Sequence, residues 1–226
     1  MRRIFSSNIF CFNCGQELRA DSLPGICNKC LGTFKFNGLL PHSSWKENFL
    51  EVYSPIIYDG IIKNLIFKMK YDRVKLIAYP LGLIMADYLN YIKKYDENTI
   101  LVPIPLAEQR EEERGFNQAR LLAEVIGAEL KITCNYKLLY RRHNTPPLFN
   151  LKPGQRKMVL EGAFILDEKF KDLNKENIIL IDDIYTTGST LNEAARVFYK
   201  AGVINIKGFT AGVALKKEKF DKEYNL

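Results

Sequence analysis

Two adjacent carboxylates and a run of small hydroxyl residues stand together in the segment NIILIDDIYTTGSTLNEAA (177–195). Backbone N–H groups and hydroxyls in a run such as TTGST can surround a phosphate, and the glycine lets the backbone approach it closely. Carboxylates would repel that phosphate unless the ligand also presents hydroxyl groups. A 5-phosphorylated ribose presents both, so the segment favours a sugar-phosphate site with the 2- and 3-hydroxyls on the two carboxylates. The candidate ligand-binding residues are Asp182, Asp183, Thr186, Thr187, Gly188, Ser189 and Thr190.

The alternative interpretation of this segment is a helix N-terminus beside incidental acidic residues. Its flanks argue for a ligand site instead. Residues 178–181 form a continuous apolar run, which is typical of a central parallel strand, and apolar residues from Leu191 to Phe198 recur at helical spacing. In open α/β sheets, ligands bind beyond the carboxyl ends of the strands, where Asp182 and Asp183 are expected.

Four of the five cysteines form two C-x-x-C pairs, CFNC and CNKC, with twelve residues between them. Pairs at such a distance can place four thiolates around one tetrahedral Zn²⁺. Because protein sulfur would fill every position, the expected zinc is structural and not catalytic. The alternatives are disulfides, which a reducing cytosol disfavours, and a thioredoxin-type redox pair, which needs only one C-x-x-C. The candidate zinc ligands are Cys11, Cys14, Cys27 and Cys30.

One segment carries the whole net charge of this 226-residue chain. The net charge is +7, yet no Asp or Glu lies between Leu130 and Leu160. Seven cations lie there, so the remainder of the chain is neutral, with 26 residues of each sign. Such a segment attracts phosphate, whether on a nucleotide, a diphosphate or a nucleic-acid backbone. The cations are Lys131, Lys137, Arg141, Arg142, Lys152, Arg156 and Lys157.

Strands and helices are expected to alternate after the cysteine pairs. Helices are expected at 58–72, 80–94, 117–130 and 191–202, and strands at 99–105, 136–140, 161–166, 177–181 and 204–215. This alternation predicts an α/β fold, in which a parallel sheet has helices on both faces. Lys63, Lys68 and Lys70 on the first helix are expected to form a solvated face.

The composition is that of a globular protein, with 47% apolar and 26% charged residues. No stretch reaches the roughly 18 unbroken apolar residues that a membrane span requires. The nearest is residues 76–89, which contain Pro80 and Asp87. The apolar part of the N-terminus is too brief for a signal peptide. The expected location is the cytoplasm, with a peripheral position at the inner face of the membrane as the alternative.

The segment IILIDDIYTTGST (178–190) resembles the ribose-5-phosphate signature of type I phosphoribosyltransferases, which bind 5-phosphoribosyl 1-diphosphate (PRPP). More narrowly, the order of parts along nearly the whole chain is similar to the ComF family, named for bacterial competence. Its most specific part is RGFNQA (114–119) after a VPIP strand; the others are the cysteine pairs, KMKY, RRHNTP and EGAF. The resemblance implies a zinc-knuckle module and linker over residues 1–50 and a phosphoribosyltransferase-like domain over residues 51–226.

The resemblance also implies how PRPP would be held. The loop 105–110 would bind the diphosphate, with Arg110 and Arg114 facing this leaving group. The acid-free segment, with Arg141, Arg142, Arg156 and Lys157, would close over the ligand and contact diphosphate or nucleic acid. Mg²⁺ would be bound by diphosphate oxygens and ribose hydroxyls. The implied catalytic residues are Asp182, Asp183, Arg110, Arg114, Arg141 and Arg142.

Three functions are compatible with these features. The first is a Mg²⁺-dependent phosphoribosyltransferase that acts on an unidentified acceptor. The second is a non-enzymatic accessory protein of DNA uptake that binds single-stranded DNA, since Tyr136, Tyr140 and Phe149 are interleaved with the cations. The third is a PRPP sensor that signals to a partner through the zinc module. Competence DNA-translocation proteins are the expected partners in DNA uptake.

Overall fold

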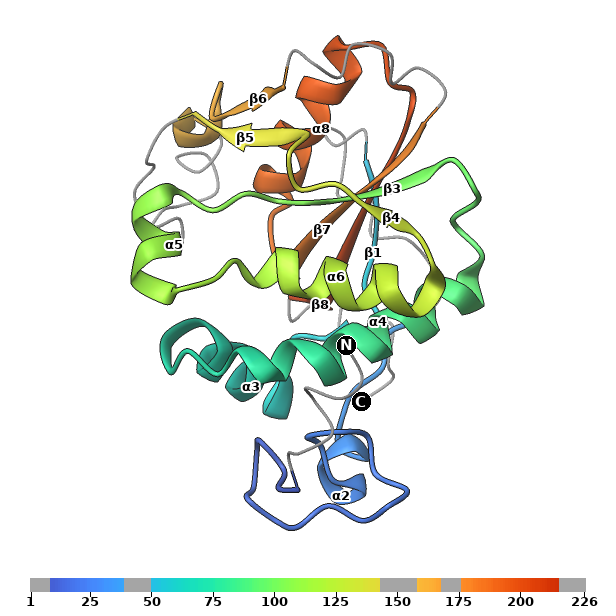
Figure 1. Cartoon of the computed structure of the whole chain (residues 1–226), viewed down its shortest axis with the longest axis vertical. Coiled ribbons are helices and arrows are strands. Elements are labelled where there is room, and N and C mark those ends of the chain that lie inside the picture. The colour runs from blue at the N-terminus through green and yellow to red at the C-terminus, as the bar shows by residue number, and fades with distance from the viewer. Residues whose placement is uncertain (1–8, 39–49, 143–157, 168–175, 216–226) are drawn as a thin grey trace.

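A sheet of parallel strands runs through the part of the chain that the computed structural model describes, residues 9–38, 50–142, 158–167 and 176–215 (Figure 1). The strands are β1 (Glu51–Tyr53), β2 (Ile56–Ile57), β3 (Thr99–Pro103), β4 (Thr133–Cys134), β5 (Leu139–Arg141), β6 (Phe164–Leu166), β7 (Asn177–Tyr185) and β8 (Asn205–Val213). The main sheet has the order β1-β8-β7-β3-β4, and β2 also pairs with β8. All of these pairings are parallel, so β7 occupies the centre of a parallel sheet.

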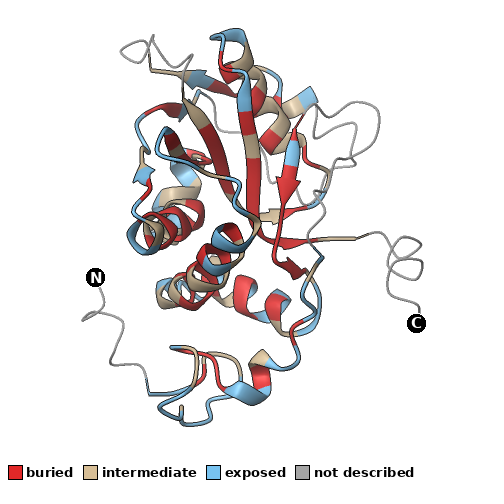
Figure 2. Cartoon of the chain, turned by 90° about the vertical axis from the view of Figure 1, so that its right-hand side faces the viewer, coloured by how far each residue is buried: buried red, intermediate tan, exposed pale blue. Residues whose placement is uncertain are grey.

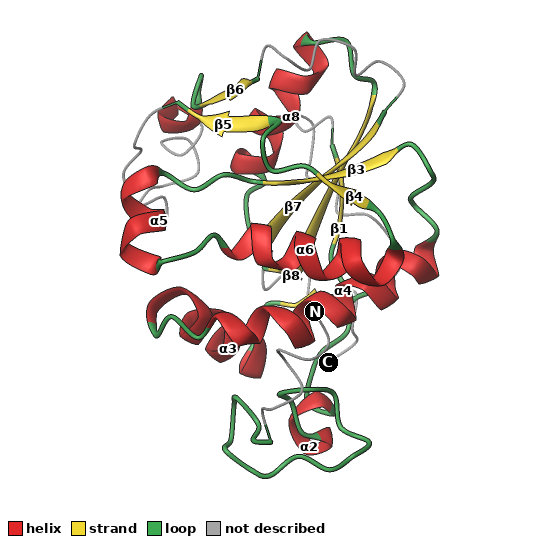
Figure 3. Cartoon of the chain, in the orientation of Figure 1, coloured by secondary structure: helices red, strands yellow, loops and turns green. Residues whose placement is uncertain are grey.

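Helices cover both faces of this sheet (Figure 3). They are α2 (Asn28–Leu31), α3 (Gly60–Tyr71), the 3₁₀ helix η1 (Lys75–Ile77), α4 (Ala78–Ile92), α5 (Glu108–Arg114), α6 (Gln118–Leu130) and α8 (Ser189–Lys200). The buried residues of α3, α4 and α6 pack on one face, and those of α8 pack on the other. The predicted α/β class is therefore confirmed. Within the described ranges, none of the helices has the length and apolar character needed to cross a bilayer.

The central strand is buried on both faces, as its apolar run predicts. Ile179 and Ile181 belong to the core under α3, α4 and α6, whereas Ile178 and Leu180 belong to the core under α8. Figure 2 shows the same pattern, with buried residues along the strands and on the inward sides of the helices. The two cores fix the directions in which the side chains of residues 178–181 point.

Two of the predicted strands lie outside the main sheet. The segments 136–140 and 161–166 contain only the short β5 and β6, which pair with each other antiparallel. Leu139 and Phe164 are buried in the core under α8, and their neighbours along the strands are exposed. Because an antiparallel pair can leave one face in water, this alternation suits a hairpin at the rim.

The prediction that the central strand ends at residue 181 is wrong, because β7 continues to Tyr185. Pairing with β8 extends as far as Tyr185 opposite Val213, whereas pairing with β3 stops at Ile181 opposite Pro103. From Asp182 onward, β7 therefore has a strand neighbour on one side only. The open side of these residues is where the candidate site lies.

The cysteine-containing segment, residues 9–38, lies below α3 and α4 in Figure 1. It contains α2 and isolated β-bridges but no extended strand within the described residues. Its buried side chains join the core that contains α3 and α4; they are Cys11, Ile26, Cys27, Cys30 and Phe34. The division of the chain at residue 50 stays a prediction.

Candidate functional site

An ion pair joins α3 to the end of β7, beyond the last residue that pairs with β3. The Nζ atom of Lys70 is 2.8 Å from each carboxylate oxygen of Asp183. The Lys70 and Asp183 side chains are only 19% and 11% exposed. Because both charges are largely removed from water, each depends on the other for compensation.

The prediction that three lysines of α3 form a solvated face is correct only for Lys63. Its Nζ atom lies 3.4 Å from Asp59 Oδ1, and both side chains are about half exposed. Lys68 instead donates to the carbonyl oxygen of Phe12 at 2.7 Å, and Lys70 belongs to the candidate site. Helical spacing identifies the apolar side of α3, but it carries no information on which segments cover the polar side.

Asp182 is partly buried beside the ion pair. Its Oδ1 accepts a hydrogen bond from the backbone N–H of Asp183 at 2.8 Å. Burial and the charge of Asp183 raise the pKa of Asp182 to about 7, although Lys70 and Arg141 oppose the shift. Two adjacent acids are thus tolerated because a cation neutralises one and the other is readily protonated near neutral pH.

Three arginines from two other elements lie near one another, and one of them, Arg141, lies near Asp182. Arg110 and Arg114 lie on α5, and Arg141 is the last residue of β5. Burial, and then the charge of Arg114, lower the pKa of Arg110. Burial, and then the charge of Arg110, lower the pKa of Arg141 to about 10, while Asp182 opposes that shift. Cations that are held together against their mutual repulsion favour an anion between them.

The predicted diphosphate loop is partly helical, because α5 occupies the second half of the stretch 105–110 and continues beyond it. Gly115 ends α5 with a φ of 78°, in the left-handed region that favours glycine. Asn117 then caps α6 by accepting the N–H of Arg120 at 3.3 Å. Its side-chain amide also donates to the carbonyl oxygen of Ile104 at 2.9 Å. The RGFNQA segment is therefore a tight turn that joins two helices to the end of β3.

The buried donors Arg110 Nη2 and Gln118 Nε2 have no hydrogen-bond partner among the described residues. Gln118 is 1% exposed, and its Oε1 accepts a hydrogen bond from Arg114 Nη1 at 3.0 Å. This bond fixes the orientation of the Gln118 amide, so Nε2 points away from Arg114. Buried donors without partners are costly, so both atoms indicate a place for acceptor atoms from a ligand or from water.

The turn from β7 to α8 has the geometry that the TTGST run predicts. Gly188 has a φ of 75° and directly precedes α8. A Cβ atom at this position would lie 2.8 Å from the ring of Tyr185 and 3.0 Å from Asn192 Nδ2, so a side chain does not fit. The hydroxyls of Thr187 and Ser189 are hydrogen-bonded at 2.9 Å. The strand–turn–helix unit therefore presents the positive end of α8 at the carboxyl end of β7.

The structure brings together residues that are far apart in the sequence: Asp182, Asp183, Arg110, Arg114 and Arg141. Arg142 follows β5 and is exposed, and Arg156 and Lys157 lie outside the described residues. Sequence reasoning missed Lys70 and Gln118 as site residues. Both lie in segments that had been singled out, KMKY and RGFNQA, but neither segment indicates by itself what its side chains contact.

The four cysteines of the paired motifs meet at one point. Their sulfur atoms all lie within 4.8 Å of one another, and Cys14 Sγ is 3.7 Å from Cys27 Sγ. Zn–S bonds of about 2.3 Å in a tetrahedron place sulfurs about 3.8 Å apart, so the cluster fits a zinc ion. None of the four forms a disulfide. Burial raises the pKa of the Cys30 thiol to about 12, so a thiolate there needs a cation such as Zn²⁺.

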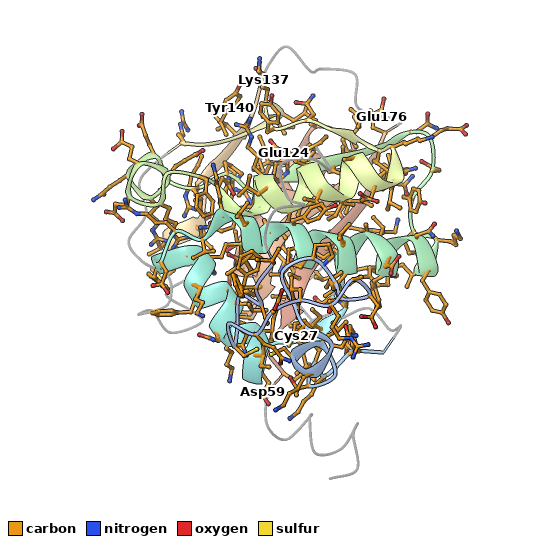
Figure 4. The ribbon with its side chains drawn as sticks, turned by 60° about the horizontal axis from the view of Figure 1, so that its bottom comes forward. Cys27, Asp59, Glu124, Lys137, Tyr140 and Glu176 are labelled. Atoms are coloured by element: carbon orange, nitrogen blue, oxygen red, sulfur yellow. The ribbon has the colours of Figure 1, made fainter. Side chains whose placement is uncertain are left out.

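Hydrogen bonds join the cysteine segment, which comes forward in Figure 4, to α3. Asn13 donates to Cys30 Sγ at 3.4 Å and accepts from Asn64 Nδ2 at 2.7 Å. Lys68 binds the carbonyl oxygen of Phe12 one turn further along the helix. Helix α3 therefore contacts the cysteine cluster through its middle and the candidate site through its last turn.

Several named proteins are similar to this chain. "Competence protein F" of Haemophilus influenzae is 34% identical over 208 residues, which are 89% of this chain and 89% of the relative. "Competence protein ComFC" of Bacillus subtilis is 36% identical over 160 residues, 68% of this chain but only 60% of that relative's length. "DNA utilization protein YhgH" of Escherichia coli K12 is 26% identical over 200 residues, 87% of this chain and 81% of the relative. No family model matches the chain.

Among solved structures, a protein of Thermus thermophilus is similar over 62% of this chain and 84% of its own. The TM-score is 0.37 and the sequence identity is 12%.

The ion pair between Lys70 and Asp183 predicts a large loss of stability in Lys70→Met. The substitution leaves a mostly buried carboxylate without its cation, which costs about 3 kcal/mol of unfolding free energy. The matched control is Lys63→Met on the same helix, where an exposed pair contributes at most about 0.5 kcal/mol. Urea unfolding measures both variants, and Asp183→Asn added to Lys70→Met should recover most of the loss. Equal effects of the two lysine substitutions would contradict the account of this pair.

The cysteine cluster predicts one zinc ion per chain by elemental analysis. Cys27→Ser removes one of the four thiolates, so we expect zinc well below one equivalent and a lower unfolding temperature. Cys134→Ser is the control, because Cys134 lies outside the cluster and should leave the zinc content unchanged. A metal-free protein that unfolds at the same temperature as the purified one would rule out a structural zinc site.

Proposed function

Because the chain belongs to the ComF family of competence proteins, we propose that it serves DNA uptake through a site that binds PRPP and transfers its phosphoribosyl group to an acceptor. The observation that supports this proposal is that three features lie at one end of the sheet. They are two aspartates, the N-terminus of α8 directly after Gly188, and three arginines. A sugar diphosphate needs all three kinds of partner: hydroxyl acceptors, a phosphate cradle and cations.

The 5-phosphate would bind at the turn 186–190. Backbone N–H groups at the start of α8 are free of intrahelical partners, and the helix dipole favours an anion there. The ribose would then extend toward Asp182 and Asp183, whose carboxylates accept hydrogen bonds from its 2- and 3-hydroxyls. Asp183 can keep Lys70 while it accepts a hydroxyl, because each carboxylate oxygen has two lone pairs. Lys70 thus holds Asp183 in place for the sugar.

The diphosphate would lie among Arg110, Arg114 and Arg141. Their mutual repulsion is unfavourable without an anion, and a diphosphate would convert it into attraction. The unpartnered Arg110 Nη2 would gain an acceptor in the same step. Diphosphate binding would therefore be stabilised in two ways: by new hydrogen bonds and by removal of the repulsion among the three arginines.

Transfer requires the bond between C1 and the diphosphate oxygen to break. Negative charge then develops on the diphosphate and positive charge on the ribose ring. The arginines stabilise the first, and the Asp182 carboxylate is placed to stabilise the second. The chain would hold Mg²⁺ indirectly, through ribose hydroxyls on Asp182 and Asp183, since Lys70 already engages both oxygens of Asp183. The ion would supply further charge neutralisation on the diphosphate when bound.

A non-enzymatic role in DNA uptake is the second candidate. The contacts of α3 favour a PRPP sensor, because the same helix binds the cysteine segment through Lys68 and the site through Lys70. For a single-stranded DNA surface the basic segment offers less: Tyr136 is 44% exposed but already packs against Arg120, with 4.0 Å from the guanidinium carbon to the ring centroid. Tyr140 remains 42% exposed, and Phe149 lies outside the described residues. Diphosphate release from PRPP and Mg²⁺ with a panel of bases, amines and oligonucleotides separates the enzyme from the sensor.

The double variant Asp182→Asn with Asp183→Asn tests the sugar site. Each carboxylate that accepts a hydroxyl contributes about 1.5–3 kcal/mol, so we expect PRPP affinity to fall at least about 100-fold by calorimetry. Asp87→Asn on the exposed side of α4 is the control and should leave the affinity unchanged. If the double variant binds PRPP as tightly as the wild type, the pocket assignment fails.

The raised pKa of Asp182, about 7, predicts a pH-dependent affinity. The Asp182 carboxyl is a strong acceptor for a ribose hydroxyl only when it is ionised, so PRPP affinity should rise between pH 6 and 8. Because PRPP itself titrates in this range, the informative quantity is the affinity ratio of wild type to Asp182→Asn, which should grow about tenfold. The free energy of unfolding of the ligand-free protein changes in the opposite direction. Because the pKa of Asp182 is raised from 3.8 to about 7, its contribution to stability is fully present below pH 4 and is lost as the pH rises through 7. A ratio that is constant with pH would contradict the role given to Asp182.

A further inference from the structure

A carboxylate on α8 holds the turn that leads into β6. In this turn, residues 160–163, the N–H of Ala163 donates to the carbonyl oxygen of Leu160 at 2.9 Å. That bond leaves the N–H of Gly162 to find an acceptor outside the turn. Glu193 supplies the acceptor, because its Oε1 lies 2.8 Å from the Gly162 nitrogen. The turn is therefore attached to α8 through one backbone hydrogen bond to a charged group.

Glu193 is itself fixed in one orientation. Its Oε2 accepts a hydrogen bond from Nε of Arg196 at 2.8 Å, and its Oε1 accepts one from Nη2 of the same arginine at 2.5 Å. The Glu193 side chain is only 11% exposed. Two parallel bonds from a planar guanidinium restrict the carboxylate more than a single cation would. Glu193 is thus a rigid point of attachment for the turn.

The attached turn adjoins the strand pair that carries Arg141. Arg141 lies opposite Phe164 in the pairing of β5 with β6, and the N–H of Arg142 donates to the carbonyl oxygen of Ala163 at 2.8 Å. The guanidinium carbon of Arg141 lies 5.5 Å from the centroid of the Phe164 ring, which is buried in the core under α8. The place of Arg141 therefore depends on how this turn is held.

Helix α8 contributes to the candidate site in two ways. Its first turn follows Gly188 and forms the phosphate cradle, and Glu193, about one turn further along, holds the strand pair. Figure 1 shows β5 and β6 beside α8, away from the cysteine segment. Because a pair of two short strands has little stability of its own, its orientation must come from contacts with the helix.

We propose that Glu193 is a positioning residue, which holds Arg141 in place for the diphosphate without contacting the ligand itself. This inference rests on the proposed function, because that proposal assigns Arg141 to the diphosphate. Electrostatics alone predicts the opposite effect: Glu193 is an anion, so its removal would strengthen the binding of another anion. The direction of the change in affinity therefore distinguishes positioning from charge.

Inorganic pyrophosphate and ribose 5-phosphate probe the two parts of the site separately, and calorimetry with Mg²⁺ present measures both affinities. Glu193→Ala should weaken pyrophosphate binding about 5- to 10-fold, because Arg141 loses its fixed position, and leave ribose 5-phosphate affinity unchanged. Glu193→Gln keeps an acceptor for the N–H of Gly162 and should restore most of the pyrophosphate affinity. Glu193→Asp keeps the charge but is one methylene shorter, so this milder variant should also weaken pyrophosphate binding.

A second arm tests whether Glu193 acts through Arg141. In a chain that already carries Arg141→Met, Glu193→Ala should cause no further loss of pyrophosphate affinity. Glu161→Ala is the matched control, because Glu161 is an exposed acid next to Gly162 and its removal should not weaken pyrophosphate binding.

Three results would overturn this inference and leave the proposed function standing. They are unchanged or tighter pyrophosphate binding in both Glu193→Ala and Glu193→Asp, an equal loss for the two probes in both variants, and a further loss in the chain with Arg141→Met. If the wild type binds neither probe, the proposed function and this inference both fail.

Discussion

Two adjacent carboxylates at the end of a buried strand can persist only if their neighbours offset the repulsion between them, and the candidate site depends on how this chain does so. Lys70 lies 2.8 Å from both oxygens of Asp183, and Asp182 has a pKa raised to about 7. Asp183 is therefore neutralised by Lys70, and Asp182 gains or loses its proton near neutral pH. A ligand that brings hydroxyl groups finds one carboxylate already oriented and a second that becomes ionised as it binds. The three arginines form the complementary half, since they are cations that repel one another until an anion arrives.

Helix α3 links the separate features of the molecule. Its apolar side lies in the main core, its middle is hydrogen-bonded to the cysteine segment, and its last turn carries Lys70. A structural zinc ion would therefore do more than fold a small segment, because it would also fix the helix that supplies a counter-ion to the site. This arrangement gives a physical reason for a cysteine segment to precede the α/β fold in one chain.

The sequence predicts the features that are encoded within one segment. The buried run at 178–181, the buried side of α8 and the convergence of four cysteines are all found in the structure. What could not be predicted depends on partners far away in the chain. The bond between Lys70 and Asp183 joins residues 113 positions apart, and the extension of β7 depends on its pairing with β8. Periodicity marks which side of an element is apolar, but a polar side chain finds its partner only when the elements assemble.

The central claim is that PRPP lies across the end of β7, and a crystal structure of the protein with PRPP and Mg²⁺ tests it most directly. The account predicts the 5-phosphate on the backbone N–H groups of residues 186–190, the ribose hydroxyls on Asp182 and Asp183, and the diphosphate between Arg110 and Arg141. A ligand bound elsewhere, or aspartates that keep only Lys70 and turn away from the sugar, would contradict it.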